Sequence, residues 1–247
     1  MLRKGHLFFA SSVNYPSIPF IAGPSYDRMG KTKGESVLGK CIIFCAAEFR
    51  ELLEPVRPED HVIAADGGLK HTEKLGISPD EILGDFDSLG YIPADSRVFP
   101  VEKDDTDAML AVRRGLQLGF REFILYGSLD GPRLDHTIAN FQTLQFLCDQ
   151  GAFGYLAGNE YLVTVVKNGM IRFPAGCEGT VSVFCLGADA DRVTLEGLYY
   201  PLENGTLTAG FPLGVSNHFT GAEATISVEK GSLLVLWDRK NGLPERG

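Results

Sequence analysis

Acidic side chains are concentrated in two short stretches, Gly84–Ser88 (Gly-Asp-Phe-Asp-Ser) and Lys103–Asp107 (Lys-Asp-Asp-Thr-Asp). Clustered carboxylates repel one another unless a cation or protonation relieves them. They suit Mg²⁺, which takes one or two carboxylates and completes its shell with water and substrate phosphate. Either stretch alone would also fit an ordinary turn. Together they predict a metal and phosphate site, with Asp105 left out as a solvent-facing cap. The four predicted ligands are Asp85, Asp87, Asp104 and Asp107.

Two further polar stretches follow apolar runs. Asp66-Gly67-Gly68 places a carboxylate beside glycines that let backbone come close to a ligand. Residues 127–136 lead through a glycine-containing loop into a predicted helix, where free backbone N–H groups favour phosphate. Arg133 can bind a phosphate with two hydrogen bonds, and Asp135 suits the helix N-cap. The side chains that we assign to this part of the site are Arg133, Asp135, His136 and Asn140.

The elements that must position these residues alternate between strand and helix. Apolar runs of the kind found in strands buried on both faces occur at 41–47, 61–65, 81–83 and 122–126. Helical spacing of apolar residues predicts helices at 106–118 and 135–150, with a shorter one at 48–53. The expected fold is a mostly parallel α/β sheet, and ligands bind such sheets outside the carboxyl ends of the strands.

The pattern changes after about residue 155. Short strand-like runs replace the helices, and Asn168-Gly169, Asn204-Gly205 and Lys230-Gly231 are turn signals between them. We predict an antiparallel β-sandwich here. The domain boundaries are therefore a tail over 1–39, an α/β domain over 40–155 and a β-sandwich domain over 156–247. The tail lies outside the regular fold.

Composition excludes several classes of protein. The apolar fraction of 44% and charged fraction of 22% are those of a soluble globular chain. A net charge of −9 argues against nucleic acid as a partner. No apolar run is long enough to span a membrane, and no secretory signal is present. Five cysteines without a Cys-x-x-Cys pair indicate thiols in a reducing compartment, so we expect a cytoplasmic protein.

The motifs in this order resemble those of thiamine pyrophosphokinases. The resemblance rests on Asp66-Gly67-Gly68, Gly84–Ser88, the Asp-x-Thr-Asp block and Arg133–His136, and it continues through residues 214–219 to Trp237. It covers essentially the whole chain from Cys41 onward. One departure is a loop before Arg133 that is a residue longer than usual and contains Pro132.

The resemblance implies Mg²⁺-dependent transfer of the pyrophosphoryl group of ATP to thiamine, giving thiamine diphosphate and AMP. It implies a homodimer with the active site between subunits. The acidic residues would handle metal and phosphate. Asp66, Gly67, Arg133, His136 and Asn140 would bind the nucleotide. The residues expected to bind thiamine are Asp135, Ser216, Asn217 and Trp237, the last by stacking on the thiazolium or as a core aromatic.

Three alternatives stay open at this stage. An aspartyl-phosphate phosphatase also carries Asp-x-Asp, but on its first strand and with a different following residue. A pterin pyrophosphokinase would share the chemistry and lack the Ser216, Asn217 and Trp237 elements. A non-catalytic thiamine-binding protein would have no need of the acidic set.

Overall fold

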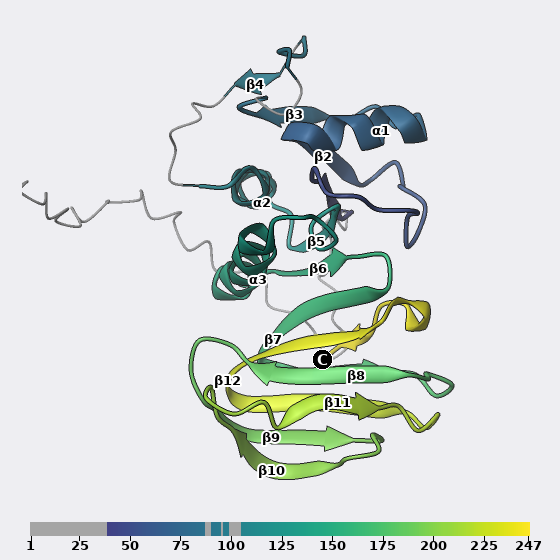
Figure 1. Ribbon diagram of the computed structural model, residues 1–247, viewed down its shortest axis with the longest axis vertical. Helices are drawn as coiled ribbons and strands as arrows, with labels where there is room; N and C mark the ends of the chain where they lie inside the picture. Colours follow the sequence, from purple (N-terminus) through teal and green to yellow (C-terminus); the bar gives the residue numbers. More distant parts are fainter. Residues whose placement is uncertain (1–38, 87–89, 95, 99–104) are drawn as a thin grey trace, which may run out of the picture. The chain divides into compact units, whose positions relative to one another are not determined.

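The computed structural model describes residues 39–86, 90–94, 96–98 and 105–247. Its first strands form the parallel part of a sheet, in the order β4-β3-β2-β1-β5-β6 (Figure 1). Their bounds are β1 Cys41–Phe44, β2 His61–Ala65, β3 Glu81–Gly84, β4 Arg97–Val98, β5 Glu122–Tyr126 and β6 Phe153–Ala157. The central strands are buried along almost their whole length, which explains their continuous apolar sequences.

The carboxyl ends of these strands lie level with one another. Phe44, the last residue of β1, lies opposite both Ala64 on β2 and Tyr126 on β5. Along the chain, β2, β3 and β4 are added in turn on one side of β1. The chain then returns, and β5 pairs with the other side of β1. Such a reversal leaves a crevice outside the strand ends. We call the residues that follow β1, β2, β3 and β5 the carboxyl edge.

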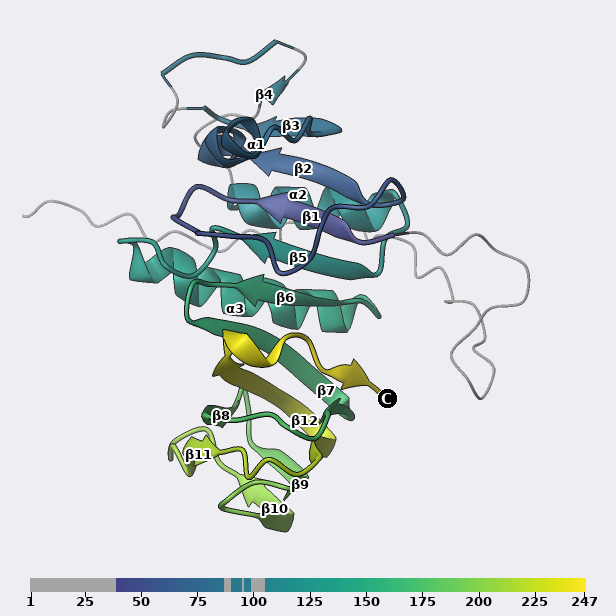
Figure 2. The ribbon, with the colours of Figure 1, turned by 90° about the vertical axis from the view of Figure 1, so that its right-hand side faces the viewer.

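One face of the parallel part is covered by helices α2 Asp107–Gln117 and α3 Leu134–Asp149 (Figure 2). Ala111 and Val112 of α2 and Leu144 of α3 are fully buried in one apolar core with the strands. The predicted helices at 106–118 and 135–150 are thus confirmed to within a residue at each end. None of the described helices is both long and apolar enough to cross a membrane.

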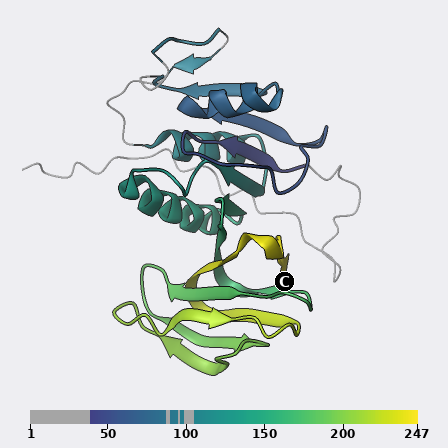
Figure 3. The same cartoon turned by 45° about the vertical axis from the view of Figure 1, so that its right-hand side comes forward.

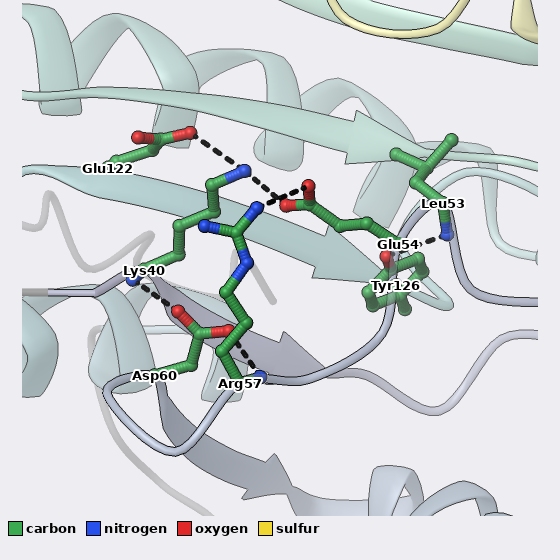
Figure 4. A network of polar contacts seen from close by, with 7 residues as sticks. All are labelled: Lys40, Leu53, Glu54, Arg57, Asp60, Glu122 and Tyr126. Atoms are coloured by element: carbon green, nitrogen blue, oxygen red, sulfur yellow. Dashed lines mark hydrogen bonds and ion pairs between the residues drawn. The ribbon is translucent and has the colours of Figure 1, made fainter.

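The other face is covered by helix α1 Leu69–Leu75 and by the irregular segment 45–60. The predicted helix at 48–53 is wrong, because other partners take the backbone N–H groups there. The N–H of Arg50 donates to Asn159 Oδ1 at 2.8 Å. The N–H of Leu53 donates to the Tyr126 hydroxyl at 3.0 Å, as Figure 4 shows. Phe49, just before Arg50, packs into the core.

Lys40 and Asp60 tie the two ends of this segment together. Both Lys40 and Arg57 donate backbone N–H groups to the Asp60 carboxylate at 2.8 Å (Figure 4). The Lys40 ammonium pairs with Glu54 and lies 3.3 Å from Glu122. Burial lowers the pKa of Lys40, but the two carboxylates more than offset this and raise it above its ordinary value. The segment is therefore held by charge as well as by apolar packing.

The second half of the chain continues the same sheet with antiparallel strands, since β6 pairs with β7 (Figure 3). Their bounds are β7 Tyr161–Phe173, β8 Thr180–Cys185, β9 Ala190–Glu196, β10 Leu202–Leu207, β11 Gly214–His218, β12 Ala224–Asp238 and β13 Glu245–Arg246. The predicted fold class, a parallel α/β part followed by antiparallel strands, is confirmed.

The three predicted turns in this half are not turns but irregularities inside strands. Asn168-Gly169 lies within β7 and Gly231 within β12, and the Gly231 N–H donates to Asn168 Oδ1 at 2.9 Å. The register of β12 shifts between Val228 and Ser232, so its first half pairs with β9 and its second half with β8. Asn204 likewise lies within β10. Left-handed residues serve a bulge as well as a turn, and here they bend long strands.

Glu81, at the amino end of β3, holds α2 to the sheet. Arg114 Nε lies 2.9 Å from both carboxylate oxygens of Glu81, and Arg97 Nε lies 3.3 Å away. Burial alone would raise the pKa of Glu81, but the Arg114 hydrogen bonds and the charges of Arg114 and Arg97 lower it overall. This carboxylate is therefore ionised in the folded protein, and its partner is on the helix that begins at the carboxyl edge.

We predict that Arg114→Gln lowers the free energy of unfolding by about 1–3 kcal/mol at pH 7, the usual loss for a hydrogen bond to a charged group. The folded pKa of Glu81 is depressed, so its contribution is present above the ordinary value of 4.5 and is lost as the pH falls through the lower folded value. The difference from wild type should shrink below that pH in urea titrations. Arg192→Gln, which breaks an exposed pair with Glu229, should change little. A difference that grows on acidification would contradict the assignment.

Candidate active site

Three of the predicted aspartates lie at or near the carboxyl edge. Asp66 directly follows β2, and Asp85 directly follows the neighbouring strand β3. Asp107 is the first residue of α2. Burial raises the pKa of the Cys45 thiol at the end of β1 to about 12, and the charge of nearby Asp107 contributes to the shift. The start of α2 is therefore close to the end of β1.

Glycines let the backbone segments of this edge approach one another closely. A Cβ atom on Gly84 would lie 3.0 Å from the Cα of Asp66, which places the two acidic turns side by side. A Cβ on Gly68 would lie 1.8 Å from the Phe44 carbonyl oxygen, and one on Gly127 2.4 Å from that of Cys45. No side chain fits at these positions. Close packing of the backbone therefore explains why glycine occupies these positions in the predicted motifs.

Backbone strain coincides with the motif residues. Asp66 has φ 46°, Phe86 58° and Ser216 57°, in the left-handed region that residues other than glycine seldom adopt. Such a conformation costs on the order of 1–3 kcal/mol and persists only where the surroundings enforce it. Phe86 is 3% exposed, so its buried ring anchors the backbone that follows Asp85.

The structure differs from our prediction that Asp105 is a solvent-facing cap at the start of α2. The N-cap is Thr106, whose hydroxyl accepts a hydrogen bond from the Met109 N–H at 3.2 Å. Asp105 does not face solvent as a cap. Its carboxylate is 19% exposed and lies 3.0 Å from Arg113 Nε. Asp105 therefore neutralises a charge on the helix, which supports leaving it out of the metal site.

Arg133 and Asp135 form an exposed ion pair at the start of α3. Arg133 Nη2 donates to Asp135 Oδ2 at 2.7 Å, and this hydrogen bond is the main cause of a lowered pKa of Asp135. The suggestion that Asp135 caps α3 is wrong, since the helix begins at Leu134 and its N-cap position is Arg133. Both side chains are 65% exposed. They are accessible to a ligand in solution.

The loop between β5 and α3 is held by Asn140. Its Nδ2 donates to the Ser128 carbonyl at 2.7 Å, and its side chain is buried. The Ser128 hydroxyl donates to the Leu125 carbonyl at 2.8 Å, which fixes the same turn. His136 is exposed on the first turn of α3. Asn140 thus holds the loop between β5 and α3 in place.

Two of the residues predicted to bind the acceptor, Ser216 and Asn217, lie on β11 in the antiparallel half. Ser216 is exposed, and its N–H donates to Ser182 Oγ at 3.0 Å. Asn217 is buried, and its amide is bonded to the backbone of Tyr200 on both sides. Sequence reasoning missed Tyr200. The available signal was a pair of aromatic residues, Tyr199 and Tyr200, directly before a proline.

Trp237 does not offer the stacking face that we predicted for it. The residue is 0% exposed, and its ring packs edge-on against Tyr155 and Phe173. Its indole N–H donates to the Gly242 carbonyl at 2.8 Å. No part of the ring reaches a ligand, so Trp237 acts as a core aromatic.

Two of the four predicted metal ligands, Asp87 and Asp104, lie outside the described residues. Within the described ranges, no three His, Cys, Asp or Glu side chains come together in a way that could hold a metal ion. Mg²⁺ commonly binds only one or two carboxylates and completes its shell with water and phosphate. Asp85 and Asp107 therefore fit the donor chemistry of this ion.

A cavity of about 690 Å³ lies away from these aspartates, between the segment after β1 and the end of β12. None of the predicted site residues lines it. Arg239, one of the lining residues, donates to the carbonyls of Glu51 and Gly158 at 2.6 Å and so holds the backbone around the cavity.

Comparison with known proteins matches both halves of the chain. The domain described as "Thiamin pyrophosphokinase, catalytic domain" matches residues 54–152, and "Thiamin pyrophosphokinase, vitamin B1 binding domain" matches residues 170–233. Thiamine pyrophosphokinase of Bacillus subtilis (strain 168) is 29% identical over 191 residues, 70% of this chain and 85% of the relative.

Solved structures agree with this match. A crystal structure of the Bacillus subtilis thiamine pyrophosphokinase superposes with a TM-score of 0.69 at 27% identity, covering 80% of this chain and 98% of the other. That of Geobacillus thermodenitrificans gives 0.66 at 27% identity, covering 79% and 96%. The yeast thiamin pyrophosphokinase, at 13% identity, shares the fold with a TM-score of 0.63 over 85% and 89%.

The matches to the catalytic domain and to the Bacillus subtilis relative define this chain as an enzyme of the phosphotransferase class that takes a nucleotide co-substrate. Within that class, the chain belongs to the thiamine pyrophosphokinase family.

Gly127 provides a test of the close packing at this edge. Its φ is 62°, and an added Cβ would meet the carbonyl oxygens of Cys45 and Ala47. Gly151 has φ 67°, and an added Cβ there would have nothing within 4 Å. An alanine at this position is therefore disfavoured only by the left-handed backbone. We predict that Gly151→Ala costs about 1 kcal/mol of unfolding free energy. Gly127→Ala should cost at least about 2 kcal/mol more. Equal losses in denaturant titrations would contradict this description of the edge.

Proposed function

We propose that the enzyme transfers the pyrophosphoryl group of Mg²⁺-bound ATP to thiamine, giving thiamine diphosphate and AMP. The observation that carries the proposal is the position of Asp66 after β2, Asp85 after β3 and Asp107 at the start of α2 in a chain of this family. A metal–triphosphate complex needs this acidic chemistry, whereas binding of thiamine alone does not.

The two halves of the chain would bind different substrates. In this proposal residues 40–155 bind ATP and metal, and residues 156–247 bind thiamine. Of the tail over 1–39, only Gly39 is among the described residues, and the tail takes no part in the proposal. All five cysteines are free thiols, which supports the cytoplasm as the proposed location.

At the phosphate end, Asp85 and Asp107 would hold Mg²⁺ together with Asp87 and Asp104. When bound, the ion offsets the negative charge of the triphosphate. Arg133 would bind a phosphate through its fork of N–H donors. Asp135 Oδ2 accepts a hydrogen bond from Arg133 Nη2 at 2.7 Å, which holds the guanidinium in place. The remaining proposed contributors to the nucleotide site are Asp66, Gly67, His136 and Asn140.

Asp135 would also orient the acceptor. Hydrogen bonding to Arg133 lowers its pKa, so the carboxylate is ionised at neutral pH. An ionised carboxylate can accept a hydrogen bond from the hydroxyl of thiamine and hold it for attack on the β-phosphorus. Positioning and charge neutralisation supply most of the rate in phosphoryl transfer. Ser216 is the proposed polar contact to the pyrimidine.

We predict that the enzyme with Mg²⁺, ATP and thiamine releases AMP and not ADP, measured by chromatography of the products. Asp85→Asn should reduce the turnover number at least about 100-fold, since lost charge stabilisation of this kind is worth several kcal/mol. Asp149→Asn, an exposed carboxylate at the end of α3, is the matched control and should be normal.

Two results would overturn the proposed function. One is a wild-type enzyme that accepts a hydroxymethylpterin in preference to thiamine. The other is thiamine binding without AMP release, which would indicate a non-catalytic binding protein.

The proposed site needs two chains. The path through the sheet from β3, beside Asp85, to β8, beside β11, passes β2, β1, β5, β6, β7 and β12 (Figure 1). At roughly 4.8 Å per step this separation is on the order of 30 Å. A single chain therefore holds Ser216 far from its own Asp85. We propose a homodimer in which each site takes its acidic edge from one chain and Ser216 from the other.

Co-expression of Asp85→Asn and Ser216→Tyr chains tests this arrangement. Each variant alone is expected to be inactive, the second because its side chain fills the acceptor site. A mixed dimer would hold one intact site, so random pairing should restore about one quarter of wild-type activity. A mixture as inactive as its components would show that each site belongs to one chain.

A further inference from the structure

Asp130 lies in the loop between β5 and α3, three residues before Arg133. Its Oδ2 atom accepts a hydrogen bond from the Asn159 N–H at 2.6 Å, a short contact of the kind that carboxylate acceptors form. Asn159 lies in the tight turn between β6 and β7, where the Gly158 N–H donates to the Tyr161 carbonyl at 3.0 Å. The side chain of Asp130 therefore attaches its loop to the neighbouring strand connection.

The three residues before Asp130 are held as well, through their main-chain carbonyls. These carbonyls accept from Ala47 N–H to Gly127 at 3.0 Å, from Asn140 Nδ2 to Ser128 at 2.7 Å and from the Thr137 hydroxyl to Leu129 at 3.3 Å. Asp130 is the fourth anchor in this row and the nearest in sequence to Arg133. The carbonyls thus fix the start of the loop, and Asp130 fixes the end that leads to the proposed phosphate ligand.

The turn that Asp130 binds is itself fixed from two other parts of the chain. Asn159 Oδ1 accepts from the N–H of Arg50, in the segment after β1, at 2.8 Å. The Gly158 carbonyl accepts from Nη1 of Arg239, directly after β12, at 2.6 Å. A Cβ atom on Gly158 would lie 3.0 Å from Asp130 Oδ2, so the carboxylate packs closely against the turn. Asp130 is therefore bonded to a part of the molecule that has a defined position.

We propose that Asp130 is a positioning residue for phosphate transfer: its hydrogen bond to the Asn159 N–H sets the position of this loop and so of the Arg133 guanidinium. The inference rests on the proposed function. Only Gly131 and Pro132 separate the two residues, and the ring of Pro132 restricts the backbone between them. Arg133 is 65% exposed on a long side chain, so its placement depends on the backbone that carries it. A displacement of about 1 Å in such a group can cost on the order of 100-fold in rate.

Steady-state kinetics of Asp130 variants test the inference. Asp130→Ala should lower kcat/KM for ATP about tenfold or more and leave the KM for thiamine within about twofold of wild type, because only the phosphate end of the site is displaced. Asp130→Asn keeps an oxygen that can accept from the Asn159 N–H and should recover most of the loss. Glu160→Gln removes a carboxylate from the same turn, where it pairs with exposed Arg50, and should leave both values unchanged.

A double-mutant cycle with Arg133 separates positioning from a general structural role. If Asp130 acts through Arg133, Asp130→Ala should add less than about twofold in an Arg133→Ala background. An equal loss in both backgrounds would assign Asp130 a general structural role and remove the positioning claim.

Hydrogen exchange of the loop amides gives a readout that does not depend on activity. Exchange at residues 128–133 should be faster in Asp130→Ala than in wild type or Glu160→Gln, and unchanged exchange would contradict the inference. Asp130 is exposed, so its variants should fold, and thermal unfolding checks this. Should Asp130→Ala be unfolded at the assay temperature, Asp130→Ser takes its place with the same expected losses.

The failure of this inference is distinguishable from failure of the proposed function. If wild type makes AMP from ATP with thiamine while Asp130→Ala keeps the wild-type kcat/KM for ATP, the positioning role is wrong and the function stands. If wild type makes no AMP, calorimetric titration with a non-hydrolysable ATP analogue decides the inference alone. Weaker binding by Asp130→Ala, with no further loss when Arg133→Ala is added, would support it. Equal affinities of wild type and Asp130→Ala, including no binding by either, would overturn it.

Discussion

The pairing of β7 with β12 is the interaction on which the rest of the structure depends. These strands lie side by side from Tyr161 to Phe173, and β7 also pairs with β6, which joins the parallel and antiparallel halves into one hydrogen-bonded sheet. The bend at Asn168 and Gly231 lets β12 pair with β9 along one half and β8 along the other. Both halves of the chain therefore share one frame, and the acidic edge and β11 are held at a fixed separation along it. In the proposed homodimer, this fixed separation would let a second chain dock as a rigid body.

Much of this fold could be predicted from the sequence, because its central elements follow simple local rules. The buried strands β1, β2 and β5 are short apolar runs, and α2 has both a Thr cap and helical periodicity. The position of the carboxyl edge could be predicted from the parallel topology alone. The bent strands could not be predicted, since Asn-Gly suits a turn and a bulge equally well. Only the long-range pairing of β7 and β12 decides between them.

The residue types of the candidate site could be predicted from the sequence. The hydrogen-bond or packing partner of each residue could be predicted less well. Aspartates after β2 and β3 are where the sequence places them, because strand ends fix the backbone. Asn217 and Trp237 were assigned to the ligand, yet one bonds to Tyr200 and the other packs in the core. A sequence shows that a polar or aromatic group is present. It does not show whether a distant backbone segment already engages that group.

Burial of the cysteines has a consequence for redox chemistry. Burial raises the pKa of Cys45 to about 12 and that of Cys148 to about 11, and it also raises those of Cys41, Cys177 and Cys185. The thiolate is the form that oxidants and electrophiles attack. In the folded protein the buried sulfurs of Cys41 and Cys45 are therefore almost unreactive near neutral pH, and they become reactive when the sheet opens. Labelling of these two thiols would then report unfolding.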